Sequence, residues 1–201
     1  MLDARLRPLI DPPLNALGRV LARAGISANA VTLAGLIPAL GAAWALAERE
    51  FLLALALILI NRLLDGLDGA VARARGLTDF GGFLDILLDF VFYVAVPLGF
   101  ALAMPDNVLP ALVLVASFTL TGTSFLAFAT LAAKRGLETT AHGHKSFFYN
   151  TGLAEGTETI LVFCAMCLWP QHFAPIAYGY AVLCLLTVGQ RALIARAMFR
   201  D

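Results

Sequence analysis

The sequence is poor in charged residues. Asp, Glu, Lys and Arg make up 14% of its 201 residues, whereas hydrophobic residues make up 60%. Soluble domains carry about 25% charged residues, and one soluble core of this size could not bury so much apolar surface. The composition therefore excludes a disordered chain and an ordinary soluble enzyme. It indicates a protein that lies in a lipid bilayer.

Neither sign of charge is in excess, and cysteine is scarce. The 14 basic residues balance the 14 acidic ones, so no overall charge attracts the chain to nucleic acid. The 3 cysteines lie in apolar runs, which excludes a secreted disulfide scaffold. Cys164 and Cys167 form a C-x-x-C pair, but no further ligand follows at metal-binding spacing, and we interpret them as buried thiols.

Long apolar runs separated by short polar breaks fill most of the chain. A transmembrane helix needs about 20 mostly apolar residues. Six runs meet this requirement: Ala28–Ala47, Phe51–Ala72, Phe80–Met104, Val108–Ala133, Phe147–Leu168 and Ala174–Ile194. Residues 2–24 mix leucine with arginine and proline, which predicts an amphipathic helix on the membrane surface. We expect one all-α, polytopic membrane domain over residues 1–201, with a six-helix bundle over residues 28–194.

The positions of the basic residues predict the orientation in the membrane. Arg73, Arg75, Lys134 and Arg135 fall on the same side as the N-terminal segment, whereas Arg49 falls on the opposite side. Lys and Arg are retained on the cytoplasmic side. We therefore expect both termini to face the cytoplasm, and the start of the chain lacks the pattern of a cleaved signal peptide.

Four aspartates lie within two consecutive apolar runs. Asp65 and Asp68 are spaced i, i+3, and Asp85 and Asp89 are spaced i, i+4, so each pair shares a helix face. In an antiparallel hairpin Asp68 faces Asp85 and Asp65 faces Asp89, about 10 Å inward from the connecting loop. Carboxylates this close together need a counter-ion. A hard divalent cation with oxygen ligands, Mg²⁺ or Mn²⁺, suits them.

A purely structural interpretation of these charges is also open. Arg62 could pair with Asp65 and Arg73 with Asp68, but this would leave the second pair of aspartates unexplained. Small residues around the aspartates permit close helix packing and equally leave space for a flat ligand. Arg73 lies at the predicted cytoplasmic rim, where a guanidinium can bind phosphate. A divalent metal, an arginine and a slot of small residues together indicate a diphosphate ligand.

The segment Asp65–Arg73, DGLDGAVAR, is followed by Gly81, Asp85 and Asp89. This pattern resembles the signature of the CDP-alcohol phosphotransferase family, D-x-x-D-G-x-x-A-R and then G-x-x-x-D-x-x-x-D. The spacer between the two halves is one residue shorter here than in the family. The segment 27–32, SANAVT, is similar to the T-P-N-x-x-T opening of the family's first span, with alanine in place of proline.

The resemblance implies a phospholipid-synthesising reaction. A phosphatidyl group passes from CDP-diacylglycerol, or a similar CDP-lipid, to an alcohol, and CMP is released. The implied metal ligands, for two Mg²⁺ or Mn²⁺ ions, are Asp65, Asp68, Asp85 and Asp89. Asp85 and Asp89 would serve catalysis, with Asp89 as the base. The implied contacts to CDP are Gly69, Ala72, Arg73, Gly81, Asn29 and Thr32. The resemblance also suggests a homodimer, and we expect it in a bacterial inner membrane with a cytoplasmic active site.

The residues that bind the acceptor alcohol are less well defined. Glu155 and Glu158 share a face of the fifth run, and Lys145 precedes it, so these three are candidates. Helix packing through Gly152 and Gly156 is an equal alternative. Gly156 stands where relatives that use inositol-type acceptors carry arginine. We therefore predict that inositol phosphate is not the acceptor, which leaves glycerol 3-phosphate or an amino alcohol such as serine.

Two functions of other classes remain alternatives. An intramembrane prenyltransferase also uses aspartates, Mg²⁺ and a diphosphate, but its aspartate motifs lie far apart in the chain. A cation transporter could use the carboxylates as an ion path. The transporter is disfavoured because the carboxylates lie near one membrane face and no broken helix is predicted at mid-membrane.

Overall fold

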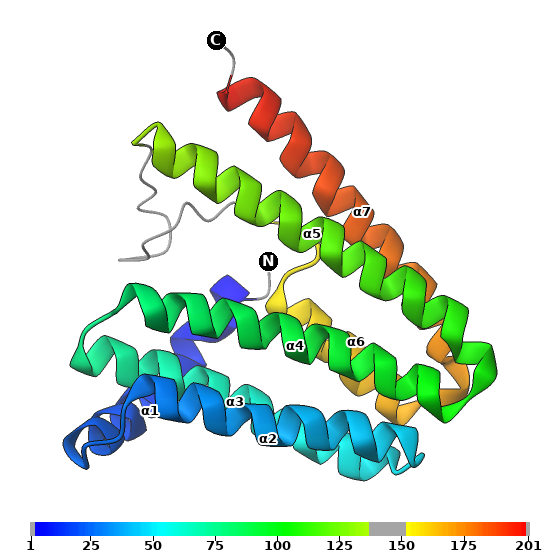
Figure 1. Ribbon diagram of the computed structural model, residues 1–201, viewed down its shortest axis with the longest axis horizontal. Coiled ribbons are helices and arrows are strands. Elements are labelled where there is room, and N and C mark those ends of the chain that lie inside the picture. The colour runs from blue at the N-terminus through cyan, green and yellow to red at the C-terminus, as the bar shows by residue number, and fades with distance from the viewer. Residues whose placement is uncertain (1–2, 137–151, 200–201) are drawn as a thin grey trace.

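A computed structural model describes residues 3–136 and 152–199 and shows a helical protein over this range (Figure 1). The helices are α1 (Asp3–Arg23), α2 (Ala28–Ala47), α3 (Phe51–Arg75), α4 (Asp79–Ala103), α5 (Val108–Lys134), α6 (Gly156–Leu168) and α7 (Phe173–Met198). Short 3-10 turns, Pro105–Asn107 and Pro170–His172, precede α5 and α7. The expected all-α class is confirmed, and the predicted ends of the long helices agree to within a few residues.

The helices of the bundle differ in how well they suit a membrane. Within residues 3–136 and 152–199, four are long and apolar enough to cross one: α2, α4, α5 with its 3-10 turn, and α7 with its 3-10 turn. Helix α3 has 25 residues but carries several charges. Helix α6 has only 13 residues, and the start of the expected span 147–168 lies outside the described residues. Six spans therefore remain a prediction, of which the structure supports four.

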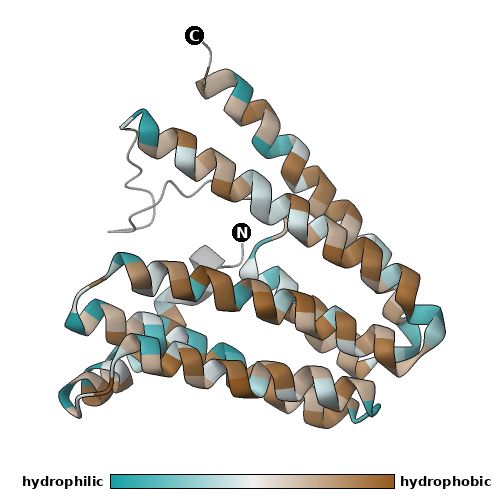
Figure 2. Ribbon diagram, viewed as in Figure 1, coloured by the Kyte–Doolittle hydropathy of each residue, from teal (hydrophilic) through white to brown (hydrophobic). Residues whose placement is uncertain are grey.

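Apolar side chains cover the outside of the bundle. On α2, Leu33, Ile37, Leu40 and Trp44 follow each other at helical spacing and are 52%, 76%, 52% and 61% exposed. Figure 2 shows the hydrophobic colour along the helix bodies and the hydrophilic colour concentrated near helix ends. A soluble protein rarely exposes so large an apolar surface. This surface is suited to lipid and supports an integral membrane protein.

One core joins the helices from α2 to α7. Buried aromatic rings of α4, α6 and α7 stack within it; the centroids of Phe100 and Phe173, for example, are 4.5 Å apart. Helices α2 and α4 approach closely at Gly99, where an added Cβ would lie 2.6 Å from the carbonyl oxygen of Ala43. The described residues thus form one bundle, and the assignment of residues 1–201 to one domain stays a prediction.

Helix α1 packs against α3. An added Cβ on Gly18 would lie 2.6 Å from the Cβ of Ala70, so these two backbones cross at close range. Leu14 and Leu21 pack with Leu67 and neighbouring residues in a second, smaller apolar cluster. Placement of this helix on the membrane surface remains a prediction, but its contact with α3 brings it to the end of α3 where the aspartates lie.

The turn between α3 and α4 is short and well defined by hydrogen bonds. Gly76 ends α3 with a φ of 108°, a conformation that glycine adopts without strain. Thr78 caps α4, because its side-chain oxygen accepts a hydrogen bond from the Gly81 amide at 3.1 Å. The two helices consequently form the antiparallel hairpin that the aspartate spacing requires.

Candidate metal and donor site

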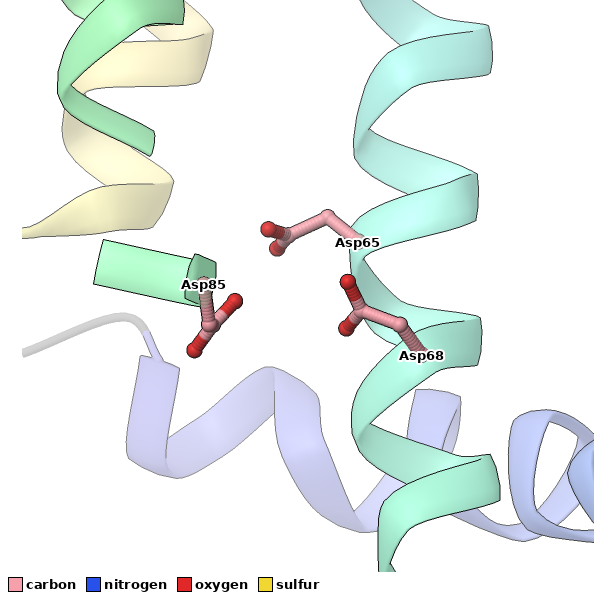
Figure 3. A group of neighbouring side chains, drawn as sticks. All are labelled: Asp65, Asp68 and Asp85. Carbon is pink, nitrogen blue, oxygen red and sulfur yellow. The ribbon is translucent and has the colours of Figure 1, made fainter. Parts of the chain in front are cut away.

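Three of the four aspartates meet between α3 and α4. Asp65 and Asp68 project from α3 and Asp85 from α4, and one carboxylate oxygen of each lies within 4.8 Å of the others (Figure 3). Asp68 is buried, at 5% exposure. Oxygen ligands from several carboxylates are the donor set that Mg²⁺ and Mn²⁺ prefer. The predicted facing of Asp68 and Asp85 is confirmed, and the arrangement fits a divalent cation.

Asp89, the fourth aspartate, contacts an arginine. The Nη1 atom of Arg62 donates to Asp89 Oδ1 at 2.9 Å and lies 3.7 Å from Asp65 Oδ2. The expectation that salt bridges would leave Asp89 unexplained is therefore wrong, because Arg62 reaches across from α3 to α4. Arg62 was anticipated only as a partner of Asp65. Its position inside an apolar run was the available signal that it takes part in a site.

Asn61 holds the guanidinium of Arg62 from the other side. The Oδ1 atom of Asn61 accepts from Arg62 Nε at 2.8 Å and from Nη2 at 2.6 Å. Asn61 Nδ2 in turn donates to the carbonyl of Gly35 on α2 at 2.9 Å. The guanidinium carbon also lies 4.1 Å from the centroid of the Phe92 ring. Asn61 escaped the sequence interpretation because an isolated asparagine in a helix carries no motif.

A cavity joins these groups. It is open on one side, and the space between its walls, open mouth included, is about 290 Å³. Residues of α2, α3 and α4 line it, including all four aspartates, Asn61 and Arg62. Thr32, one of the predicted donor-binding residues, lines it as well. The structure thus brings Thr32 to the aspartates across a separation of more than thirty residues in the chain.

Arg73 extends from the last turn of α3 towards α1. Its Nε and Nη2 atoms donate to Asn15 Oδ1 at 3.1 and 2.9 Å. Its partner is therefore Asn15 rather than Asp68, which corrects the structural alternative for this arginine. An added Cβ on Gly69 would lie 3.3 Å from Arg73 Nη1, so the small residue leaves room beside the guanidinium. Asn15 was not anticipated, since its segment was interpreted only as a membrane-surface helix.

The other predicted donor residues lie around the same end of the hairpin. An added Cβ on Gly81 would lie 3.2 Å from Asn29 Oδ1, which places the Asn29 side chain against the first turn of α4. Ala72 lies in the last turns of α3, where its carbonyl accepts from the Gly76 amide at 2.9 Å. The starts of α2 and α4 and the end of α3 therefore surround one region.

The candidates for acceptor binding are only partly described. Lys145 lies outside the described residues. Glu155 precedes α6 and accepts from the Gly152 amide at 2.9 Å, and Glu158 lies in the first turn of α6. Gly152 packs against the side chain of Thr187 on α7, and a Cβ added to Gly152 would clash with that side chain. Gly152 thus packs closely against α7, but it does so from the segment before α6 and not from a helix, so the expected helix-packing pair of Gly152 and Gly156 is not what the structure shows. A site role for the two glutamates remains a prediction.

The segment before α6 is held by α7. Thr187 Oγ1 accepts hydrogen bonds from the amides of Leu153 and Ala154 at 3.1 and 3.0 Å. Tyr180 Oη and Thr159 Oγ1 are 2.8 Å apart. These contacts fix where α6 begins and thus where the two glutamates lie.

Comparisons with known proteins identify relatives of this chain. The family model described as CDP-alcohol phosphatidyltransferase matches residues 26–191. The inner membrane protein YnjF of Escherichia coli is 52% identical over 192 residues, which cover 95% of this chain and 93% of that protein. The archaetidylinositol phosphate synthase of Pyrococcus horikoshii is 36% identical over 100 residues, which cover 49% of this chain and 53% of that protein.

Solved structures share the fold. The crystal structure of phosphatidylinositol phosphate synthase (PgsA1) of Mycobacterium tuberculosis with CDP-DAG bound has a TM-score of 0.74 at 22% identity, covering 94% of this chain and 98% of that chain. The same protein in complex with manganese and citrate has a TM-score of 0.73 at 22% identity, covering 94% of this chain and 93% of that one. At such identity the likeness concerns the fold alone.

Proposed function

Because this chain belongs to the CDP-alcohol phosphatidyltransferase family, we propose that it transfers a phosphatidyl group from CDP-diacylglycerol, or a similar CDP-lipid, to an alcohol and releases CMP. The observation that carries the proposal is the meeting of Asp65, Asp68 and Asp85 within 4.8 Å at the end of the α3–α4 hairpin. Phosphoryl-type transfer depends mainly on positioning and on neutralising charge, and this cluster is suited to both.

The three aspartates would hold Mg²⁺ or Mn²⁺. A bound divalent ion neutralises charge on the diphosphate and on the departing phosphate. The Mycobacterium tuberculosis relative was crystallised with manganese, which supports the choice of metal. The motif implies two ions, and Asp65, Asp68 and Asp85 account for one of them.

The residues around the hairpin would bind the CDP part of the donor. Arg73, oriented by Asn15, would contact the diphosphate, and Gly69 leaves room beside it. The full donor set we propose is Gly69, Ala72, Arg73, Gly81, Asn29 and Thr32. The acceptor hydroxyl oxygen forms a bond to the phosphorus next to diacylglycerol, the bond from that phosphorus to CMP breaks, and Asp89 accepts the hydroxyl proton.

The identity of the acceptor rests on the segment around α6. Two relatives are named as synthases of inositol phosphate lipids. This chain has glycine at position 156, where an arginine is expected for such an acceptor. A multiply charged acceptor in a partly dry site needs that cation. We therefore propose glycerol 3-phosphate or serine as the acceptor, with Lys145, Glu155 and Glu158 as its contacts.

The arrangement in the membrane follows from the same argument. We propose that both termini and the site face the cytoplasm of a bacterial cell, where CMP and the alcohol are soluble, and that the chain forms a homodimer. The prenyltransferase and transporter alternatives lose support because the family match concerns CDP-alcohol chemistry.

The proposal is tested by a transfer assay with purified protein and labelled CDP-diacylglycerol. Glycerol 3-phosphate, serine and inositol phosphate are supplied in parallel, with Mg²⁺, and the labelled lipid products are separated. We expect a new phospholipid with one of the first two acceptors. Rapid product with inositol phosphate would contradict the argument from Gly156, and no lipid product with any alcohol would contradict the transferase assignment.

A further inference from the structure

Arg62 is a cation built into the carboxylate cluster. Its side chain is 12% exposed, and its nitrogens contact Asp89, Asp65 and Asn61 at the distances given above. One guanidinium therefore lies against two of the four aspartates, whose side chains are 30% and 37% exposed. Arginine keeps its charge under all ordinary conditions, so this positive charge is permanent.

The position of the guanidinium is fixed on every side. Asn61 accepts from Nε and Nη2, and Nη1 points at Asp89. Asn61 is itself tied to the backbone of α2 through the carbonyl of Gly35, and Phe92 covers the flat face of the guanidinium. Arg62 therefore cannot leave Asp89 without breaking several contacts in a partly dry site.

A divalent ion bound to Asp89 would have to compete with this arrangement. Such an ion approaches a carboxylate oxygen to about 2.1 Å. Asp89 Oδ1 already accepts from Arg62 at 2.9 Å, so the ion would have to displace the guanidinium from Oδ1 or bind Oδ2 beside it. Two cations side by side repel each other more strongly away from bulk water. Loss of the Asp89 contact would also leave the buried guanidinium with Asp65, at 3.7 Å, as its nearest described carboxylate. Asp65, Asp68 and Asp85 can take an ion without disturbing the contact between Arg62 and Asp89.

We propose that Arg62 takes the place of the second metal ion in the donor-free protein, so that the carboxylate cluster binds one divalent cation rather than two. Arg62 then acts as a positioning residue that holds the Asp89 carboxylate in place before substrates arrive. The proposal rests on the metal site of the proposed function. It concerns the donor-free protein, because the phosphates of the donor add negative charge to the cluster and so change how many cations it can hold.

The number of bound Mn²⁺ ions tests this proposal. Purified protein in detergent micelles, free of donor, is titrated with Mn²⁺ while free Mn²⁺ is measured by electron paramagnetic resonance. We expect one ion per wild-type chain. Two ions of similar affinity would overturn the role of Arg62 and leave the metal site intact. If the protein binds no Mn²⁺, or if Asp68→Asn binds Mn²⁺ as well as wild type does, the metal site of the proposed function is contradicted instead. The two failures are therefore distinguishable.

Variants of Arg62 and Asp89 give matched controls. Arg62→Met should bind two ions, the first at least about tenfold more tightly because a nearby positive charge is gone. Arg62→Lys keeps the charge and should bind one. The double variant Arg62→Met/Asp89→Asn lacks both partners and should also bind one. Unchanged stoichiometry and affinity in a folded, monodisperse Arg62→Met protein would overturn the proposal. If Arg62→Met does not fold, the wild-type and Arg62→Lys stoichiometries decide it.

Discussion

A methyl group added to Gly18 should push α1 away from α3 and weaken donor binding at a distance. The new Cβ would lie 2.6 Å from Ala70 Cβ and 2.8 Å from the Ala70 carbonyl carbon. These neighbours belong to the backbone or its first side-chain atom, so they cannot turn aside. Overpacking of this kind destabilises by about 1–3 kcal/mol. If all of it opposes the docking of α1, the docked population falls about 5- to 160-fold relative to the undocked one.

The functional consequence passes through Asn15. When α1 shifts, its two hydrogen bonds to Arg73 lengthen or break, and the guanidinium loses its orientation towards the diphosphate. We therefore expect Gly18→Ala to raise the KM for CDP-diacylglycerol about tenfold or more, with a smaller change in kcat. Asn15→Ala, which removes the hydrogen bonds without moving α1, should act in the same direction.

The assay measures initial rates against CDP-diacylglycerol concentration in mixed micelles. Gly179→Ala on α7 is the matched control, because its added Cβ would meet no described atom within 4 Å. It should leave the KM unchanged, since alanine only improves the propensity of the helix. The reasoning is refuted if Gly18→Ala and Asn15→Ala both show the donor KM of Gly179→Ala.

Three further substitutions separate chemistry from structure. Asp68→Asn should reduce transfer at least about a thousandfold, because the metal ion that neutralises the phosphate charge loses a ligand. The thermal unfolding profile should stay close to wild type. Arg73→Ala should raise the donor KM about tenfold. Arg75→Ala should change the donor KM much less, but it should lower the unfolding temperature because the carbonyls of the α1–α2 turn lose their hydrogen bonds to Arg75. Thr187→Val should destabilise the protein by about 1–3 kcal/mol, because two amides lose their acceptor. Thr119→Val is its control, because the exposed Thr119 hydroxyl donates to the Val115 carbonyl within the same helix, α5.

The site could be anticipated wherever a single helix or one hairpin determines it. Helical periodicity puts Asp65 and Asp68 on one face, and the antiparallel hairpin brings Asp85 opposite them. Both steps depend on local geometry, and the structure agrees with them. The ends of the long helices were also predictable, because apolar length and flanking polar residues are local signals.

Contacts between distant segments were not predictable in the same way. Arg62 reaches Asp89 only through the relative rotation of α3 and α4, which spacing does not specify. Asn15 meets Arg73 because α1 crosses α3 at Gly18, a tertiary contact between small residues. The start of α6 depends on hydrogen bonds to Thr187 in α7, so apolar length alone predicted a longer helix.

The release of CMP from CDP-diacylglycerol by the purified protein tests the central claim most directly. The account predicts that CMP appears in equal amount with a new phospholipid, only when an alcohol acceptor and Mg²⁺ or Mn²⁺ are both present, and that a chelator stops the release until metal is returned. Full release of CMP in metal-free buffer, or by the Asp68→Asn protein, would contradict it.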